Sequence, residues 1–283
     1  SSDLYLSVAI KSLTDNANKN YKYRIVILNT GLNAKRCKLF DIFNDDNFKI
    51  DFVNISKQME GIESKFKNIY HFGLASYYRL FIENLFPQYN RIIYLDCDIV
   101  VLGDISKLFF IDMENKNIAG VVEQFILHSD VFSLYTKEAV GVEAKEYINS
   151  GIMLMDLNKL REQKVEQSFV NLINSYNFDV IDPDQAYINY LCKGKIKYLS
   201  FDWNRTPIEC VECKNPNIVH YALGLKPWQD KNMFLGEYFW KYARLSPFYT
   251  EIEENFKSFD VTARLKKERA GIDIQLQAIE YAK

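Results

Sequence analysis

The sequence predicts an α/β fold in which a mixed, mostly parallel sheet is flanked by helices and followed by a helical C-terminal region. Strand-like and helix-like segments alternate along most of the chain, which is typical of a sheet with helices on its faces. The 283 residues can bury a sizeable core. No long linker or internal repeat divides them.

The first part of the chain supplies two helices and two strands. Ser2 and Asp3 can cap a first helix, on which Leu6, Ile10 and Leu13 share one face. The polar residues at 29–31 end in a glycine and predict a turn. The other expected elements are a strand at Arg24–Leu28, a helix at Ala34–Phe43 and a strand at Ile50–Val53.

Further elements follow with the same alternation. Helical spacing is shown by Leu74, Tyr78, Phe81 and Leu85, and Pro87 ends that helix before a strand at 92–95. Later strands are expected at Ala119–Val122, Ile152–Met155, Lys197–Phe201 and Ile218–His220. From about Tyr238 the chain is mostly helical, and it becomes basic at Arg264, Lys266, Lys267 and Arg269.

Composition argues against several classes of function. Lys and Arg total 35 against 37 Asp and Glu, so the net charge of −2 gives no reason to expect a nucleic-acid partner. No apolar run is long enough to span a membrane. The five cysteines, including Cys210 and Cys213, fit free intracellular thiols better than a disulfide framework or a zinc site. We expect a cytoplasmic protein.

The most informative feature is the pair Asp96 and Asp98 after the apolar run Ile92–Leu95, which suits a buried strand. Carboxylates there are costly to desolvate unless a positive charge meets them. Side chains two positions apart on a strand point the same way, so both can face one ion. Their oxygens suit Mg²⁺ or Mn²⁺. A merely polar strand end is the alternative.

Four segments accompany this pair in a specific order. They are Ser76–Leu80, Asn149–Asp156, Asp182–Asn189 and His220–Trp228. Together with Asp96-Cys97-Asp98, they resemble glycosyltransferase family 8, the retaining nucleotide-sugar transferases, from about Tyr5 to Trp228. The resemblance implies a GT-A-type fold. It also implies a hexosyltransferase that moves glucose or galactose from a UDP-sugar to a glycan or lipid-linked saccharide.

The resemblance also implies a metal site. Asp96, Asp98 and His220 match the family's metal ligands, and Lys226 matches a lysine that contacts the diphosphate. Imidazole beside carboxylates favours Mn²⁺, with Mg²⁺ as the alternative. Cys97 lies within the same motif but should face away from the metal, because strand side chains alternate.

Other matches concern the donor sugar. By resemblance Arg79, Asn149 and Asp184 hold the sugar, and Gln185 lies near the anomeric carbon. His71 falls where the family has another donor-site residue. The family's phosphate-loop glycine is displaced by one position here, to Gly224 after Leu223, so the backbone approach to phosphate should differ.

The resemblance begins at the first helix of the family, after its first strand. We therefore expect a further apolar strand upstream of Ser1 in the middle of the sheet, because neighbouring strands would otherwise leave backbone groups unpaired. We expect a catalytic domain at 1–237 and a helical region at 238–283. The latter can face the acceptor or, through its basic residues, the inner surface of a membrane. A solvated helix face is the alternative.

Two other functions fit parts of the sequence. Asp96-Cys97-Asp98-Ile99-Val100 matches the motif of haloacid-dehalogenase-like phosphatases, in which the first Asp attacks phosphorus. That motif normally follows the first strand of a chain, and it leaves His220 and Lys226 unexplained. A non-catalytic sugar-nucleotide binder is the second alternative. The complete metal triad and Gln185 argue against it, since a binder needs no electrophilic activation.

Overall fold

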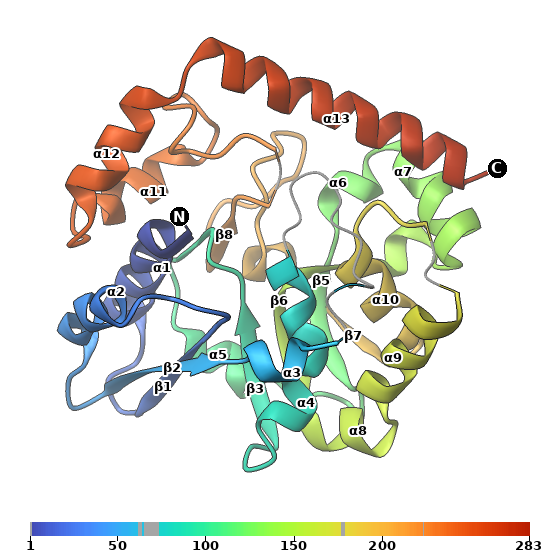
Figure 1. Cartoon of the computed structure of the whole chain (residues 1–283), viewed down its shortest axis with the longest axis horizontal. Helices are drawn as coiled ribbons and strands as arrows, with labels where there is room; N and C mark the ends of the chain where they lie inside the picture. Colours follow the sequence, from blue (N-terminus) through green and yellow to red (C-terminus); the bar gives the residue numbers. More distant parts are fainter. Residues whose placement is uncertain (1, 62–63, 65–73, 177–178, 223) are drawn as a thin grey trace.

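The computed structural model describes all residues except 1, 62–63, 65–73, 177–178 and 223 (Figure 1). Its main sheet has the strand order β3-β6-β5-β7. These strands are β3 (Arg91–Leu95), β6 (Ile148–Asp156), β5 (Ile118–Val122) and β7 (Ile196–Leu199). Two smaller sheets pair β1 (Tyr23–Asn29) with β2 (Phe48–Asn54), and β4 (Ile99–Val101) with β8 (Ile218–His220).

The α/β class and the mixed sheet are confirmed, but the strands are not mostly parallel. β6 runs antiparallel to both β3 and β5, and β4 runs antiparallel to β8. Only the pairs β1–β2 and β5–β7 are parallel among the described strands. The connection explains the direction of β6: the chain between β5 and β6 forms short helices and enters β6 from the end of the sheet at which it left β5.

Helices flank these strands on both sides (Figure 1). The α-helices are α1 (Ser2–Asn16), α2 (Ala34–Lys38), α3 (Ser56–Met59), α4 (Ile82–Leu85), α5 (Ile105–Phe109), α6 (Gln124–Leu127), α7 (Asp130–Tyr135), α8 (Leu157–Glu162), α9 (Val165–Ser175), α10 (Pro183–Leu191), α11 (Gly236–Ala243), α12 (Tyr249–Ser258) and α13 (Val261–Tyr281). Short 3₁₀ turns occupy η1 (Leu39–Phe43), η3 (Leu74–Phe81), η5 (Ala144–Glu146) and η6 (Phe201–Trp203), and a π turn occupies η4 (Thr136–Val140).

The predicted elements are present, with differences at their ends. The helix expected at 34–43 is α2 continued by η1, and Asn33 caps it by accepting a hydrogen bond from the Lys35 N–H. The helix expected at 74–85 is η3 followed by α4. The strand expected at 197–201 was placed too late: β7 ends at Leu199, because Phe201 already belongs to η6.

Apolar clusters of buried side chains pack against the sheets. One packs β6 against η3 and α9, with Met153, Tyr77 and Phe169 almost fully buried. A second joins α1, β1 and β2 to α11 and α12. The domain boundary at 237 stays a prediction, but it falls inside α11, whose Phe239 and Trp240 belong to this second cluster.

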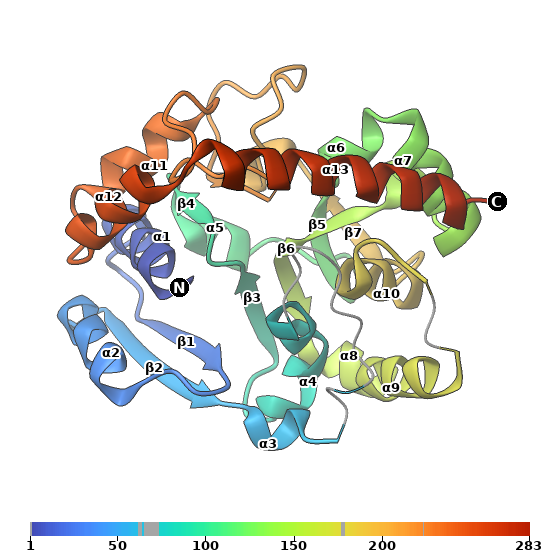
Figure 2. The same ribbon diagram turned by 45° about the horizontal axis from the view of Figure 1, so that its top comes forward.

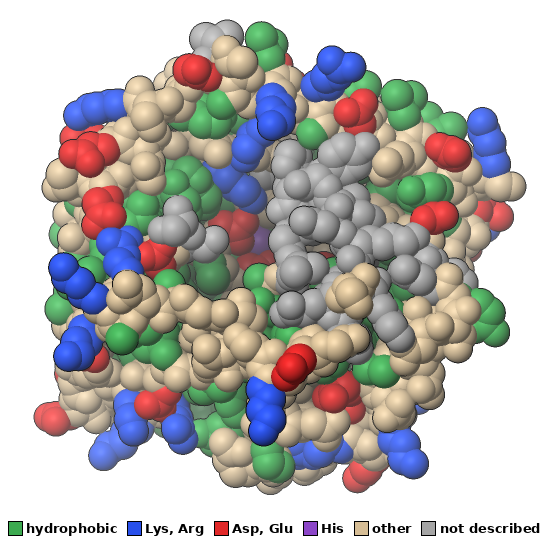
Figure 3. Space-filling view, viewed as in Figure 1, with side chains coloured by type: hydrophobic (Ala, Val, Ile, Leu, Met, Phe, Trp, Pro, Cys, Tyr) green, Lys and Arg blue, Asp and Glu red, His purple; other side chains and the backbone are tan. Residues whose placement is uncertain are grey.

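A cavity of about 1570 Å³ extends along β1 and β3 and reaches Asp96, which follows β3. Figure 3 shows a hollow near the middle of the face that it draws. Residues 21–28, residues 91–95 and one face of α1 line it. Within the described residues, β1 pairs only with β2 and β3 only with β6. Figure 2 shows β1 and β3 as separate edges. An additional strand between these edges would satisfy their backbone groups, and this strand stays a prediction.

The C-terminal helix α13 runs from α12 to α7 across one side of the molecule (Figures 1 and 2). Its Ala278 is buried in a further apolar cluster with Ile126, Phe132 and Tyr135. Other residues of α13, among them Lys267 and Ile274, line the large cavity. No helix in the described part of the chain is both long and apolar enough to cross a membrane.

Candidate active site

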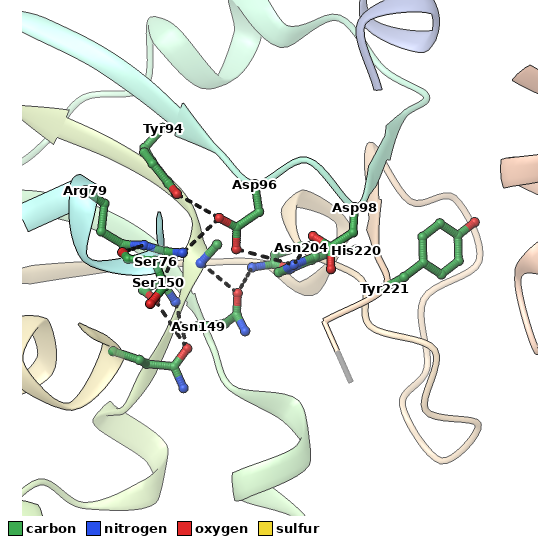
Figure 4. A network of polar contacts seen from close by, with 12 residues as sticks. Ser76, Arg79, Tyr94, Asp96, Asp98, Asn149, Ser150, Asn204, His220 and Tyr221 are labelled. Carbon is green, nitrogen blue, oxygen red and sulfur yellow. Dashed lines mark hydrogen bonds and ion pairs between the residues drawn. The ribbon is translucent and has the colours of Figure 1, made fainter. Parts of the chain in front are cut away.

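Two strand ends bring the predicted metal ligands together (Figure 4). Asp96 and Asp98 follow β3, and His220 ends β8, which pairs with β4 through Ile99 opposite His220. The Nε2 atom of His220 lies 3.3 Å from Oδ1 of Asp98 and 3.7 Å from Oδ2 of Asp96. One ligand atom from each of the three residues lies within 4.8 Å of the others, so these side chains could hold one ion.

Asp96 is oriented by two donors to a single oxygen. Its Oδ1 accepts hydrogen bonds from Nη2 of Arg79 at 2.9 Å and from the hydroxyl of Tyr94 at 2.8 Å. The Arg79 guanidinium also lies over the Tyr94 ring, 4.6 Å from its centroid. Because Oδ1 is engaged, Oδ2 is the oxygen left to face His220.

Asp98 and His220 are oriented in the same way. Oδ2 of Asp98 accepts from Nζ of Lys226 at 2.7 Å, which leaves Oδ1 toward His220. Nδ1 of His220 lies 3.0 Å from Oδ1 of Asn204, so Nδ1 carries the proton and Nε2 presents its lone pair to the carboxylates. Two carboxylate oxygens and a neutral imidazole nitrogen form a donor set that fits a divalent ion such as Mn²⁺.

The two carboxylates have different electrostatic surroundings. Burial raises the pKa of Asp96, and Arg79 only partly opposes this effect. Burial acts on Asp98 too, but the pKa of Asp98 lies below its usual range, with the positive charge of Lys226 as the largest opposing cause. Arg79 is itself buried, yet Asp184 and Asp96 keep its pKa above the usual value. Cationic groups therefore already compensate these carboxylates in part.

Gly151 of β6 makes room for this cluster. Its carbonyl accepts from the Asp96 N–H at 2.8 Å, which extends the β3–β6 pairing to the first ligand. A Cβ atom at this position would lie 2.2 Å from Cε1 of His220 and 2.6 Å from Oδ2 of Asp96. Only glycine fits between these two side chains.

Arg79 connects the candidate metal ligands Asp96, Asp98 and His220, here called the metal cluster, to the predicted sugar-binding residues. Its Nε lies 3.1 Å from Oδ2 of Asp184, and its Nη1 donates to Oγ of Ser150 at 2.9 Å. Ser150 is also linked to Gln185, whose Oε1 accepts from the Ser150 N–H at 3.0 Å. Arg79, Asp184 and Gln185 all line the large cavity, next to Asp96.

Asn149 is held by protein groups. Its Nδ2 donates to Glu123, and its Oδ1 accepts from the Gly151 N–H at 3.0 Å and from Nδ2 of Asn204 at 2.9 Å. Through Asn204, it supports the orientation of His220. Its contact with a sugar stays a prediction, whereas the structure shows its hydrogen bonds to Asn204 and Gly151 beside the candidate metal ligands.

The loop after β8 closes the other side of the cluster. Nζ of Lys226 also donates to the carbonyl of Tyr221, which fixes it beside Asp98. Nζ of Lys267, on α13, donates to the carbonyl of Gly224 at 2.9 Å and to Oε1 of Gln229 at 2.8 Å. Burial and the neighbouring Lys226 lower the pKa of Lys267 to about 8. The C-terminal helix thus contributes a second cation to this side of the cavity.

The structure describes most, but not all, of the remaining residues for which the sequence made a prediction. His71 lies outside the described residues, so its role stays a prediction. Cys97 is exposed, and its sulfur is not part of the metal cluster. Cys210 and Cys213 are free thiols, as expected.

Sequence reasoning missed several residues that orient the site. Tyr94 precedes Asp96 by two residues on the same strand and therefore shares its face, a signal that the sequence did contain. Asn204 and Glu123 come from distant loops, and nothing in the sequence pattern marks them. Asp182 begins one of the four segments, and the sequence predicted no role for it, although its carboxylate accepts a hydrogen bond from Gln185.

Comparison with known proteins places this geometry in a family. A model of glycosyl transferase family 8 matches residues 4–232. General stress protein A of Bacillus subtilis is 30% identical over 256 residues, covering 81% of this chain and 85% of that protein. The lipopolysaccharide 1,2-glucosyltransferase of Escherichia coli is 28% identical over 201 residues, covering 65% of this chain and 58% of its own length.

Solved structures agree on the fold. The galactosyltransferase LgtC, solved with donor and acceptor sugar analogs, has a TM-score of 0.71 at 22% identity, covering 87% of this chain and 92% of its own. The bifunctional glycosyltransferase WbbM has a TM-score of 0.78 at 20% identity; this chain spans 50% of it. Both support the GT-A fold. The family match over most of the chain shows that this protein belongs to glycosyl transferase family 8.

Proposed function

We propose that the protein is a metal-dependent, retaining hexosyltransferase that moves glucose or galactose from a UDP-sugar to a glycan or lipid-linked saccharide. One observation carries the proposal. The ligand atoms of Asp96, Asp98 and His220 converge at the edge of a cavity that Lys226 and Gln185 also line. Relatives named as a glucosyltransferase and a galactosyltransferase support a sugar donor.

The chain's own residues can perform distinct parts of the transfer. A divalent ion held by Asp96, Asp98 and His220 would supply positive charge to the donor's diphosphate. Lys226 lies beside Asp98 and can offset the negative charge that builds on the departing UDP. Arg79 and Asp184, paired at 3.1 Å, offer a guanidinium and a carboxylate to sugar hydroxyls. Their mutual contact keeps both groups in place before the donor arrives.

We propose front-face substitution with retention of configuration. Double displacement needs a carboxylate on the β face of the sugar, as in retaining glycosidases. The residue expected near the anomeric carbon is Gln185, a poor nucleophile, and Asp184 is engaged by Arg79. The acceptor hydroxyl would then enter on the side from which UDP departs. A diphosphate oxygen can take its proton, so no separate general base is required.

Measuring the turnover of UDP-sugars distinguishes the proposed transferase from a non-catalytic binder and from a phosphatase. UDP-glucose, UDP-galactose and other UDP-sugars are incubated with Mn²⁺, and release of UDP is measured with and without saccharide acceptors. Release that depends on Mn²⁺ supports the transferase, and an α-linked product by NMR supports retention. A β-linked product contradicts retention. Binding without turnover would indicate a non-catalytic binder. Phosphate release from a phosphomonoester would indicate a phosphatase that uses Asp96 as its nucleophile.

Gln185→Ala tests the residue at the proposed reaction centre. Its carbonyl oxygen can stabilise positive charge on an oxocarbenium-like sugar, so we expect kcat to fall by roughly 10- to 100-fold, or about 1.5–3 kcal/mol. The donor KM should change little, because the contact strengthens only in the transition state. Steady-state kinetics measure both values. A raised KM with unchanged kcat would show ground-state binding instead. A sugar trapped covalently on Asp184 would favour double displacement.

We further propose that α13 contacts a membrane surface. Four of its apolar side chains are 42–59% exposed and recur at helical spacing: Leu265, Ile272, Leu276 and Ile279. The exposed residues Lys266 and Arg269 lie on the same helix. Exposed apolar side chains beside basic ones favour an interfacial position on anionic lipid. Co-sedimentation with anionic vesicles should be lost in the double variant Ile272→Ser/Leu276→Ser. Unchanged co-sedimentation would contradict this contact.

A further inference from the structure

We propose that Asp182 is a positioning residue that fixes the side-chain amide of Gln185, with its oxygen directed to the strand that carries Ser150. This inference rests on the proposed function only for the importance of Gln185. The contacts themselves lie within the chain. Asp182 immediately precedes α10, and its carboxylate does not cap that helix.

Asp182 is a buried acceptor for three donors. Asp182 is only 7% exposed. Oδ1 accepts from the hydroxyl of Tyr135 at 3.1 Å, and Oδ2 accepts from the hydroxyl of Tyr147 at 2.7 Å. Oδ2 also accepts from Nε2 of Gln185 at 3.0 Å. A buried carboxylate without a cationic partner is costly, and these three hydrogen bonds are what compensate it.

The contacts allow only one orientation of the Gln185 amide. Nε2 must face Asp182, because a carboxylate can only accept. Oε1 must face Ser150, because the backbone N–H there can only donate. A flipped amide would place oxygen against carboxylate and N–H against N–H. Asp182 therefore decides which end of the amide is presented to the cavity that Gln185 lines.

The surroundings of Asp182 make its hydrogen bond with the Gln185 amide sensitive to pH. Burial, with a smaller contribution from the nearby carboxylate of Asp184, raises the pKa of Asp182 to about 7. Burial also keeps Tyr135 and Tyr147 neutral, since it raises the pKa of both far above the usual value. Tyr281, at the end of α13, makes a small further contribution to the raised pKa of Tyr135. Protonated Asp182 is a weaker acceptor and has a hydrogen of its own to place, so we expect its hydrogen bond from Gln185 to weaken below about pH 7.

The test compares two buried acids. In Asp182→Asn, the new amide group must place an N–H among the three donors. We expect kcat to fall by roughly 10-fold with KM almost unchanged, as for a lost orienting contact. We also expect wild-type kcat to decline below about pH 7, where Asp182 becomes protonated, and this decline should be absent in Asp182→Asn. Glu83→Gln is the matched control. Burial raises the pKa of Glu83 to about 7 as well, but its Oε1 accepts from the Glu166 N–H and not from Gln185.

A spectroscopic readout keeps this inference separate from the proposed function. The side-chain amide signals of Gln185 in a ¹H–¹⁵N spectrum are identified by their loss in Gln185→Ala. They should shift with a midpoint near pH 7 in the wild type and in Glu83→Gln, but not in Asp182→Asn. Signals that keep their pH dependence in Asp182→Asn overturn the inference, and so does a wild-type kcat–pH profile in that variant. Absence of wild-type turnover with every UDP-sugar would instead contradict the proposed function alone.

Discussion

Asp98→Ala is expected to remove activity almost completely, with turnover lower by roughly 1,000-fold or more. Asp98 supplies one of three converging ligand atoms, and its other oxygen holds Lys226 at 2.7 Å. The change therefore removes a metal ligand and releases the cation expected to face the leaving group. Losing a single group that stabilises transition-state charge already costs on the order of 100- to 1,000-fold. Steady-state kinetics with saturating donor measure the loss.

Binding measurements identify the cause of that loss. Titration of Mn²⁺ by electron paramagnetic resonance should show weaker binding in Asp98→Ala, and UDP binding should require more Mn²⁺ than in the wild type. Asp98→Asn keeps the shape and one ligand oxygen, so it should bind Mn²⁺ at an intermediate level. If Asp98→Ala binds Mn²⁺ as the wild type does, the three residues do not form the metal site.

Asp104→Ala is the matched control for removal of a carboxylate. Asp104 caps α5 by accepting from the Ser106 N–H at 2.9 Å, and it is not part of the metal cluster. Its loss should cost about 1 kcal/mol of folding stability through the helix cap. Mn²⁺ affinity and kcat should stay at the wild-type level. A fall in Mn²⁺ affinity here would show that the assay reports stability rather than coordination.

Local patterns predicted most elements of the fold, but not how the strands pair. Alternating apolar segments and helix-ending residues such as Pro87 act within a few residues, so they appear in the sequence. Strand direction depends on where the connecting chain packs. The antiparallel β6 follows from short helices between β5 and β6, whose position is set by tertiary contacts. The expected excess of parallel strands was wrong for this reason.

Some residues of the site could be predicted from the sequence, and others could not. The period of a strand predicted that Asp96 and Asp98 face the same way, although both residues lie between β3 and β4. His220 is more than one hundred residues away, and the pairing of Ile99 with His220 that brings it close has no local signal. The family resemblance supplied it. Asn204 contacts His220, and Asp182 contacts Gln185, through one hydrogen bond each, and these bonds exist only after the chain has folded.

Gly151→Ala is expected to disrupt the metal cluster without removing any of its ligands. The added Cβ would lie 2.2 Å from Cε1 of His220 and 2.6 Å from Oδ2 of Asp96, far inside van der Waals contact. The backbone of Gly151 cannot easily move away, because two hydrogen bonds hold it. The Gly151 carbonyl accepts from the Asp96 N–H, and its N–H donates to Asn149 at 3.0 Å. The imidazole or the carboxylate must therefore move out of position.

The ring of His220 has little room to move, because the residue is 2% exposed and Asn204 holds Nδ1. Overpacking of this kind costs about 1–3 kcal/mol of stability. We expect Mn²⁺ affinity to fall on the order of 100-fold, at least as much as when a residue that orients a metal ligand is lost. The melting temperature and a Mn²⁺ titration separate the two effects.

Gly271→Ala is the control for the same chemical change. Gly271 lies in α13, and an added Cβ there meets no atom within 4 Å. Alanine is the better helix former by about 0.5–1 kcal/mol, so the melting temperature should hold or rise while Mn²⁺ affinity stays unchanged. If Gly151→Ala also binds Mn²⁺ normally, then His220 and Asp96 are not confined as the structure has them. If it loses Mn²⁺ binding while remaining folded, the position of the ligands, and not merely their identity, makes the site.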